Sequence, residues 1–202
     1  MELSDGDCSL IVKLARRAIT EYLENGEQID PPSDVPSFLN EKCGVFVTLH
    51  KVSGGSSSLR GCIGFPEPVK PLLEAVIDAA ICAAVRDPRF EPLTSKELED
   101  IEIEVSVLTP PEVIEAKPQD LASKIKIGRD GLIAERGWNR GLLLPQVPVE
   151  EKWDVEEFLM YTCLKAGLGP DAWWDPKTKF FSFQAIVFGE DGPKGPMRRH
   201  AL

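Results

Sequence analysis

The sequence predicts an α+β protein in which a mainly antiparallel sheet packs with helices. Apolar residues recur at helical spacing in residues 9–23 and 69–86, so both segments are expected to form helices with buried faces. Apolar and polar residues alternate in residues 44–51 and 101–107, which is typical of half-buried strands. Arg-Asp-Gly at 129–131 separates two short apolar runs and is a signature of a hairpin turn, which joins antiparallel strands.

The first half of the chain is expected to supply two helices and a hairpin. The helix 9–23 is followed by a connector that contains three prolines and therefore runs extended. The strands 44–51 and 59–66 flank a glycine- and serine-rich loop, so they most simply form an antiparallel pair. The helix 69–86 is the most apolar of the chain, and an Asp-Pro pair ends it.

The second half of the chain alternates between short elements. Thr94 and Glu97 have the spacing of a capping box, which predicts a short helix before the strand 101–107. Residues 125–144 contain three short apolar runs with tight turns, which indicates a small meander. A capped helix is expected over 155–166, before the segment 179–188.

The segment 179–188 is apolar on both alternating faces and is expected to be one central strand. We therefore predict a larger subdomain of residues 1–115 and 150–188 and a smaller lobe of residues 116–149. Residues 189–202 are polar and rich in glycine and proline, and they are expected to form a flexible tail.

Composition and charge restrict the classes of function. The 202 residues are 43% hydrophobic and carry a net charge of −10, which argues for a folded globular protein and against broad binding to nucleic acid or anionic membranes. No apolar run has the length of a membrane span, and the first residues lack the features of a signal peptide. The five cysteines are scattered and the histidines number two, so we expect reduced thiols in the cytoplasm and no metal or cofactor.

The stretch 59–66, Leu-Arg-Gly-Cys-Ile-Gly-Phe-Pro, is the first candidate for a site. Gly61 and Gly64 give a strand nothing to pack, which indicates that another backbone or a ligand comes close. Alternation along the strand places Arg60 and Cys62 on one face, where the guanidinium would favour the reactive thiolate. The alternative is that Cys62 is a buried cysteine that fills a tight corner.

A histidine is the second candidate companion of Cys62. Symmetrical pairing about the loop places Thr48 opposite Cys62 and His50 opposite Arg60. His50 is then a diagonal neighbour of Cys62 at about 7–8 Å, and the two could form a pair of nucleophile and base.

Two further groups could take part. Arg86, Asp87 and Arg89 crowd the end of a helix, where the arginines either bind an anion or pair with Asp87 and the helix dipole. Glu104 lies in the middle of a strand, opposite to the isoleucines, and would need a partner if it is buried. Arg60 or Arg86 could be that partner.

These segments resemble the AMMECR domain family, in its archaeal and bacterial single-domain form, from about residue 43 to 188. The hallmark of the resemblance is Leu59-Arg60-Gly61-Cys62-Ile63-Gly64. Supporting motifs are Arg86-Asp87-Pro88-Arg89-Phe90, Glu102-Ile103-Glu104-Val105-Ser106-Val107-Leu108, Ile127-Gly128-Arg129-Asp130-Gly131-Leu132, Leu144-Pro145-Gln146-Val147 and Trp153-Asp154.

The resemblance implies one AMMECR-type domain with two unequal subdomains and the hallmark motif facing a groove between them. It supplies no reaction, because the family has no established activity. Prokaryotic members often occur beside Memo-like proteins and radical S-adenosylmethionine enzymes. A histidine at the position of His50 is not a family feature, so Glu104 or Arg60 is the better companion for Cys62.

The leading hypothesis is a cysteine-dependent enzyme that acts on a small or anionic substrate. Cys62 and Glu104 are its candidate catalytic residues. The candidate binding residues are Arg60, Gly61, Gly64, Arg86, Asp87 and Arg89. The alternative is a non-catalytic module for a ligand or protein partner. Neither hypothesis involves a membrane or nucleic acid.

Overall fold

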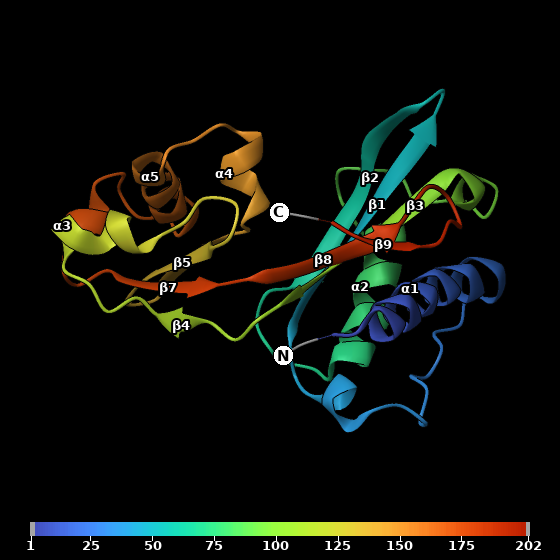
Figure 1. Cartoon of the computed structure of the whole chain (residues 1–202). Coiled ribbons are helices and arrows are strands. Elements are labelled where there is room, and N and C mark those ends of the chain that lie inside the picture. Colours follow the sequence, from blue (N-terminus) through green and yellow to red (C-terminus); the bar gives the residue numbers. More distant parts are fainter. Residues whose placement is uncertain (1–2, 201–202) are drawn as a thin grey trace. The chain divides into compact units, whose positions relative to one another are not determined.

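The computed structural model of the chain, which describes residues 3–200, is an α+β fold with two antiparallel sheets (Figure 1). This confirms the predicted fold class. The chain folds as two compact units. Of the described residues, the larger unit holds 3–108 and 186–200, and the smaller unit is Thr109–Ala185.

The larger unit is built on a five-stranded sheet with the order β2-β1-β3-β8-β9. Its strands are β1 (Gly44–Ser53), β2 (Ser56–Phe65), β3 (Ile101–Leu108), β8 (Ala185–Glu190) and β9 (Met197–Arg199). Its helices are α1 (Asp5–Asn25), α2 (Leu72–Val85), η1 (Ser37–Asn40) and η2 (Glu97–Asp100), the last two of the 3₁₀ type.

The helices α1 and α2 pack on one face of this sheet. The odd-numbered residues Val45, Val47 and Leu49 of β1 are fully buried in the same core as both helices. The even-numbered residues of β1 therefore point to the opposite face, because side chains alternate along a strand. This opposite face carries Cys62.

The smaller unit has a four-stranded sheet with the order β4-β7-β5-β6. The strands are β4 (Glu112–Val113), β5 (Gly131–Arg136), β6 (Asn139–Leu143) and β7 (Lys179–Phe183). The helices are α3 (Pro118–Leu121), η3 (Ala122–Lys124), α4 (Gln146–Glu150), α5 (Val155–Lys165) and η4 (Ala172–Trp174).

The segment from residue 150 to 185 lies in the smaller unit, not in the larger one as expected. Its helix α5 buries Phe158 and Leu159 against Leu132 and Phe180 of the smaller sheet, in a core separate from that of α1 and α2. The predicted central strand 179–188 is two strands, β7 and β8, which belong to different sheets. An apolar run shows that a strand is buried, but it does not show in which sheet.

The C-terminal segment is not a loose tail as far as the described residues extend. The strand β9 pairs antiparallel with β8, and Glu190 is 3% exposed. Polar residues at this end find partners in distant parts of the chain, which composition cannot reveal. The prediction for residues 201 and 202 lies outside the described residues.

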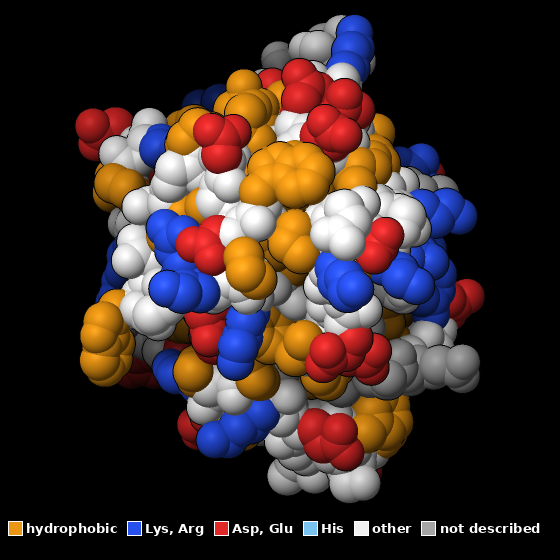
Figure 2. Space-filling view, turned by 90° about the vertical axis from the view of Figure 1, so that its left-hand side faces the viewer, with side chains coloured by type: hydrophobic (Ala, Val, Ile, Leu, Met, Phe, Trp, Pro, Cys, Tyr) orange, Lys and Arg blue, Asp and Glu red, His pale blue; other side chains and the backbone are white. Residues whose placement is uncertain are grey.

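The surface of the smaller unit carries several large hydrophobic side chains. On the face that includes α3, hydrophobic areas alternate with lysine, arginine and acidic side chains (Figure 2). Trp138, in the turn between β5 and β6, is fully exposed. Among residues 3–200, no helix is both long and apolar enough to cross a membrane.

Candidate functional site

The two glycines of the hallmark strand make room for the chain itself. A Cβ atom at Gly61 would lie 2.2 Å from the carbonyl oxygen of Ala83 in α2. A Cβ at Gly64 would lie 2.3 Å from the carbonyl oxygen of Val45 and 2.4 Å from the ring of Phe46. The predicted close approach is therefore present, and the neighbours are a helix backbone and a phenyl ring of the same unit.

The pairing of β1 with β2 contains a bulge, which changes where Arg60 lies. Thr48 is opposite Cys62, as predicted, but the register then shifts and His50 is opposite Leu59. Arg60 is thus the extra residue of β2. A bulge re-aims a side chain because two residues of one strand face one residue of the other.

The bulge directs the Arg60 guanidinium to Glu97. Its Nε and Nη2 atoms donate to the two carboxylate oxygens of Glu97 at 2.9 and 3.0 Å, and Lys51 Nζ donates to the same carboxylate at 3.1 Å. Lys51 is an odd-numbered residue of β1 and belongs to the helix-covered side. Arg60 therefore does not share the face of Cys62, and the prediction that it does is wrong.

Sequence reasoning missed the role of Glu97. The backbone N–H of Glu97 does donate to Thr94 Oγ1 at 3.3 Å, which is one half of the predicted capping box. The carboxylate, however, forms a two-point ion pair with Arg60. Arg60 thereby connects β2 to η2, and 12% of its side chain is exposed.

Asp87 and Arg89 bind the outer edge of β2. The N–H of Cys62 donates to Asp87 Oδ2 at 2.8 Å, and Arg89 Nη2 donates to the Cys62 carbonyl oxygen at 3.4 Å. Arg89 also donates to both carboxylate oxygens of Asp87, at 3.0 and 2.7 Å. This pair occupies the edge of β2 at Cys62, where an exposed strand would otherwise offer its backbone to another chain.

The ion pair with Arg89 determines the charge of Asp87. The hydrogen bonds from the Arg89 side chain, and those from the N–H groups of Cys62 and Arg89, hold the pKa of Asp87 well below its usual range, although burial opposes them. The sequence predicts that the arginines of this segment either bind an anion or pair with Asp87. Arg89 pairs with Asp87. Arg86 is apart, in the lining of a pocket with Cys82 and Gln28, and the neighbouring Tyr22 raises the pKa of its guanidinium.

The sheet face opposite α1 and α2 carries Cys62, Thr48 and Glu104 side by side. Thr48 is opposite Cys62 on one side and opposite Glu104 on the other, so the three side chains point the same way. Thr48 Oγ1 donates to Cys62 Sγ at 3.3 Å. Because neighbouring strands are about 4.8 Å apart, Cys62 and Glu104 are separated by about 10 Å.

His200 completes this line of side chains. Its Nδ1 lies 3.2 Å from Glu104 Oε2, and its backbone N–H donates to the Val187 carbonyl oxygen at 2.9 Å. Its Nε2 is buried and has no hydrogen-bond partner among residues 3–200. We call Cys62, Thr48, Glu104 and His200 the polar row. The partner of Glu104 is thus His200, and not Arg60 or Arg86 as predicted.

Gly189 of β8 lies against Glu104. A Cβ atom there would be 3.1 Å from the Glu104 Cα and 2.7 Å from the Ile103 carbonyl oxygen. The sequence around His200 does not predict a role for this histidine, because it follows a polar segment rich in glycine and proline, which is typical of a flexible tail.

Burial decides the protonation of Cys62. It raises the pKa of the Cys62 thiol, as do the charges of Asp87 and Glu104. The Thr48 hydrogen bond and the Arg89 charge lower that pKa, but burial is the largest influence. Cys62 is therefore a protonated thiol at neutral pH, which differs from the thiolate expected beside Arg60.

The polar row thus has a proton donor at one end and an imidazole nitrogen at the other. A thiol can give a proton, and the free Nε2 of a neutral imidazole can accept one. Within the described part of the chain, no group of three or more His, Cys, Asp or Glu side chains could hold a metal ion.

The fold and this row define an α+β protein with a line of polar and ionisable side chains on the sheet face opposite α1 and α2. The family model AMMECR1 matches residues 12–188. The chain belongs to the AMMECR1 family, which confirms the resemblance in the sequence.

Archaeal relatives and one solved structure cover nearly the whole chain. A protein of Thermococcus onnurineus is 60% identical, and Protein PH0010 of Pyrococcus horikoshii is 57% identical; each match spans 95% of this chain and 94% of the relative. The crystal structure of the uncharacterised protein PH0010 matches with a TM-score of 0.91 and 55% identity, over 100% of both chains. The names of these relatives state no activity, so the function is argued from the site.

Proposed function

We propose that the polar row is the reaction centre of an enzyme that moves protons on a small polar or anionic molecule. Cys62 supplies one proton and His200, oriented by Glu104, takes another. The observation that carries the proposal is the placement on one sheet face of a protonated thiol and an imidazole nitrogen that has no hydrogen-bond partner among residues 3–200.

The chemistry that fits is an isomerisation by proton transfer. The Nε2 of His200 takes a proton from one atom of the ligand, and the Cys62 thiol gives a proton to another atom. Exchange with water returns both groups to their starting states, so no oxidant or other co-reactant is needed. Cys62 and Glu104 are about 10 Å apart and His200 lies beyond Glu104, so the row suits an extended ligand with several bonds between the two reacting atoms.

Glu104 and Thr48 have supporting roles in this proposal. The Glu104 carboxylate holds the Nδ1 proton of His200, which leaves Nε2 as the proton acceptor. The Thr48 hydroxyl holds the Cys62 sulfur in place. Arg89, whose side chain is 53% exposed, lies beside the Cys62 carbonyl and favours an anionic group on the ligand.

Solvent exchange tests the proposal without a known substrate. A small-molecule extract of the host cells is incubated with the protein in D₂O and followed by mass spectrometry. We expect one metabolite to gain deuterium with the wild-type protein. Cys62→Ala and His200→Gln are expected to slow the gain by about 100-fold, in line with the usual contribution of an acid or base.

The chain offers matched controls for both substitutions. Cys82→Ala removes another partly exposed cysteine, and His50→Gln removes the other histidine. Both controls are expected to keep the wild-type rate. Exchange that Cys62→Ala and His200→Gln leave unchanged, in folded protein, would contradict the proposal.

A second candidate function is a non-catalytic ligand-binding or adaptor module. It is favoured by the raised pKa of Cys62 and by the use of Asp87 and Arg89 within the chain's own edge. It predicts a small molecule that remains bound through purification from the host, is held equally by Cys62→Ser, and gains no deuterium. For this second function, the resemblance points to work in a shared pathway with Memo-like and radical S-adenosylmethionine proteins.

We also infer that the protein works in the cytoplasm. All five cysteines are free. Thiols persist in the reduced state in that compartment.

A further inference from the structure

A second pocket lies on the helix-covered side of the larger sheet, away from the polar row. It is formed by α1 and by the turn between β8 and β9, and its volume is about 460 Å³. This volume is in the range of sites for small ligands, about 300–1,000 Å³. Its lining includes Val12, Lys13, Arg16, Arg17, Lys194 and Met197.

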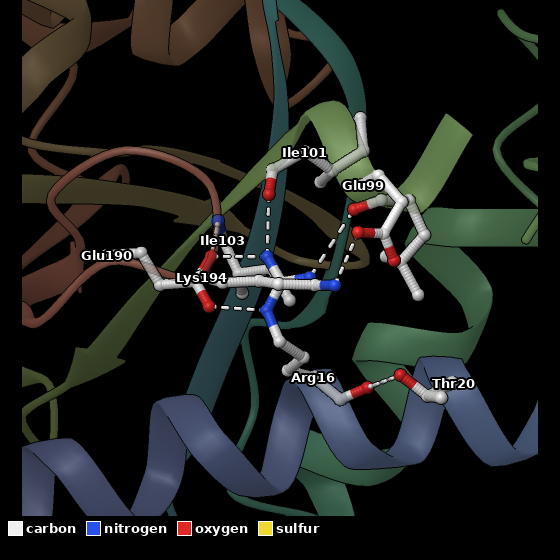
Figure 3. Close-up of polar contacts among 8 residues, drawn as sticks. Arg16, Thr20, Glu99, Ile101, Ile103, Glu190 and Lys194 are labelled. Carbon is white, nitrogen blue, oxygen red and sulfur yellow. Dashed lines mark hydrogen bonds and ion pairs between the residues drawn. The ribbon is translucent and has the colours of Figure 1, made fainter. Parts of the chain in front are cut away.

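The carboxylate in the lining of the pocket is already neutralised. Arg16 donates through Nε and Nη2 to the two oxygens of Glu190, and the N–H of Ile103 donates to Glu190 Oε2 at 3.0 Å (Figure 3). Arg16 Nη2 also donates to the Ile101 carbonyl oxygen at 2.6 Å. The Arg16 charge and these backbone contacts satisfy the Glu190 carboxylate, so its negative charge does not repel an anion in the pocket.

The other charges of the pocket are positive. Lys13 and Arg17 are one helical turn apart on α1, and neither forms an ion pair within the part of the chain that the structure describes. Lys194 pairs with the exposed carboxylate of Glu99 (Figure 3). Three cationic side chains thus lie beside the neutral Arg16–Glu190 pair, in a chain whose net charge is −10.

Lys194 is held in an unfavourable backbone conformation. Its φ of 58° is in the left-handed region, which costs free energy for a residue with a Cβ atom. The turn thereby includes a lysine in the pocket lining where glycine would fit more easily. An exposed ion pair such as that with Glu99 contributes little, so the ammonium group can exchange its partner.

We propose that this pocket binds a small molecule with a phosphate monoester group. A dianion of this kind satisfies the unpaired Arg17 fork and the ammonium groups of Lys13 and Lys194. Val12 and Met197 provide apolar surface for the carbon part of the ligand. The same chemistry occurs in soluble metabolites and in the headgroup of phosphatidic acid.

Calorimetric titration with glycerol 3-phosphate tests the soluble form, and glycerol serves as the neutral probe. We expect the protein to bind glycerol 3-phosphate and not glycerol. The double variant Lys13→Ala/Arg17→Ala is expected to weaken it at least 10-fold. The matched control Lys42→Ala/Lys124→Ala removes two exposed cations outside the pocket and is expected to bind as the wild type does.

Vesicles of phosphatidylcholine with and without phosphatidic acid test the lipid form. Suppose that the protein binds the phosphatidic acid vesicles but not glycerol 3-phosphate. If the Lys13→Ala/Arg17→Ala variant then loses vesicle binding and the control variant keeps it, the pocket is a site for a lipid headgroup. Lys194→Gly gives a further check, because glycine accepts the φ of 58°. It is expected to weaken binding without lowering the melting temperature.

Two results would overturn the proposal. One is that the protein binds neither glycerol 3-phosphate nor the vesicles that contain phosphatidic acid. The other is an equal loss in the pocket variant and the control variant, which would show a general effect of charge.

Discussion

Gly61→Ala is expected to destabilise the protein by about 3 kcal/mol or more, because the added methyl group has no space. The new Cβ atom would lie 2.2 Å from the Ala83 carbonyl oxygen and 3.1 Å from its carbon. Both atoms belong to the backbone of α2, so no side chain can rotate to relieve the contact. For a chain of this length the loss corresponds to a fall in the melting temperature of about 10 °C.

Denaturant unfolding of Gly61→Ala beside a second glycine variant measures this effect. Gly169 has no atom within 4 Å of an added Cβ, and Gly169→Ala is expected to have wild-type stability. If Gly61→Ala were as stable as Gly169→Ala, α2 would not pack against β2 as described. The glycine would then be available to a ligand or partner.

Glu190→Gln is expected to cost about 3–5 kcal/mol, because it leaves the buried Arg16 charge without its counter-charge. The side chains of Arg16 and Glu190 are 14% and 5% exposed. The amide has nearly the same shape as the carboxylate, so lost packing does not explain the loss. Thermal unfolding of the variant measures it.

An exposed pair of the same hairpin is the control. Arg198 and Asp191 lie 3.1 Å apart with more than half of each side chain exposed. Asp191→Asn is expected to leave the stability nearly unchanged, since solvent screens such pairs. An equally small effect of Glu190→Gln would show that the C-terminal hairpin is not anchored to α1.

Local sequence patterns predicted the parts of the site that depend on neighbours along the chain. The loop 52–58 fixed the partner strands, and symmetrical pairing placed Thr48 opposite Cys62 correctly. The paired glycines indicated a close approach, which the contact of Gly61 with α2 explains. The first inference rests on the alternation of side chains along a strand, and the second on the missing Cβ atom of glycine. Both are local properties of the chain.

The other parts depend on contacts between distant segments. The bulge at Arg60 has no local signal, and it moves the guanidinium from Cys62 to Glu97. Glu97 has the spacing of a helix cap, and this local pattern does not predict its ion pair with Arg60. His200 follows a Gly/Pro-rich segment whose order comes from Glu190 and Arg16, far away in the sequence.

The protonation of Cys62 is the point on which the proposed proton transfer depends. A pKa raised by burial keeps the thiol protonated to a higher pH than an ordinary cysteine, whose pKa is about 8.5. The ultraviolet absorbance of the thiolate, recorded for wild type and Cys62→Ser across a pH titration, measures this directly. We predict no difference between the two at neutral pH and a difference that grows only above the ordinary cysteine pKa. A thiolate signal of Cys62 at neutral pH would contradict the role of proton donor and favour a nucleophile.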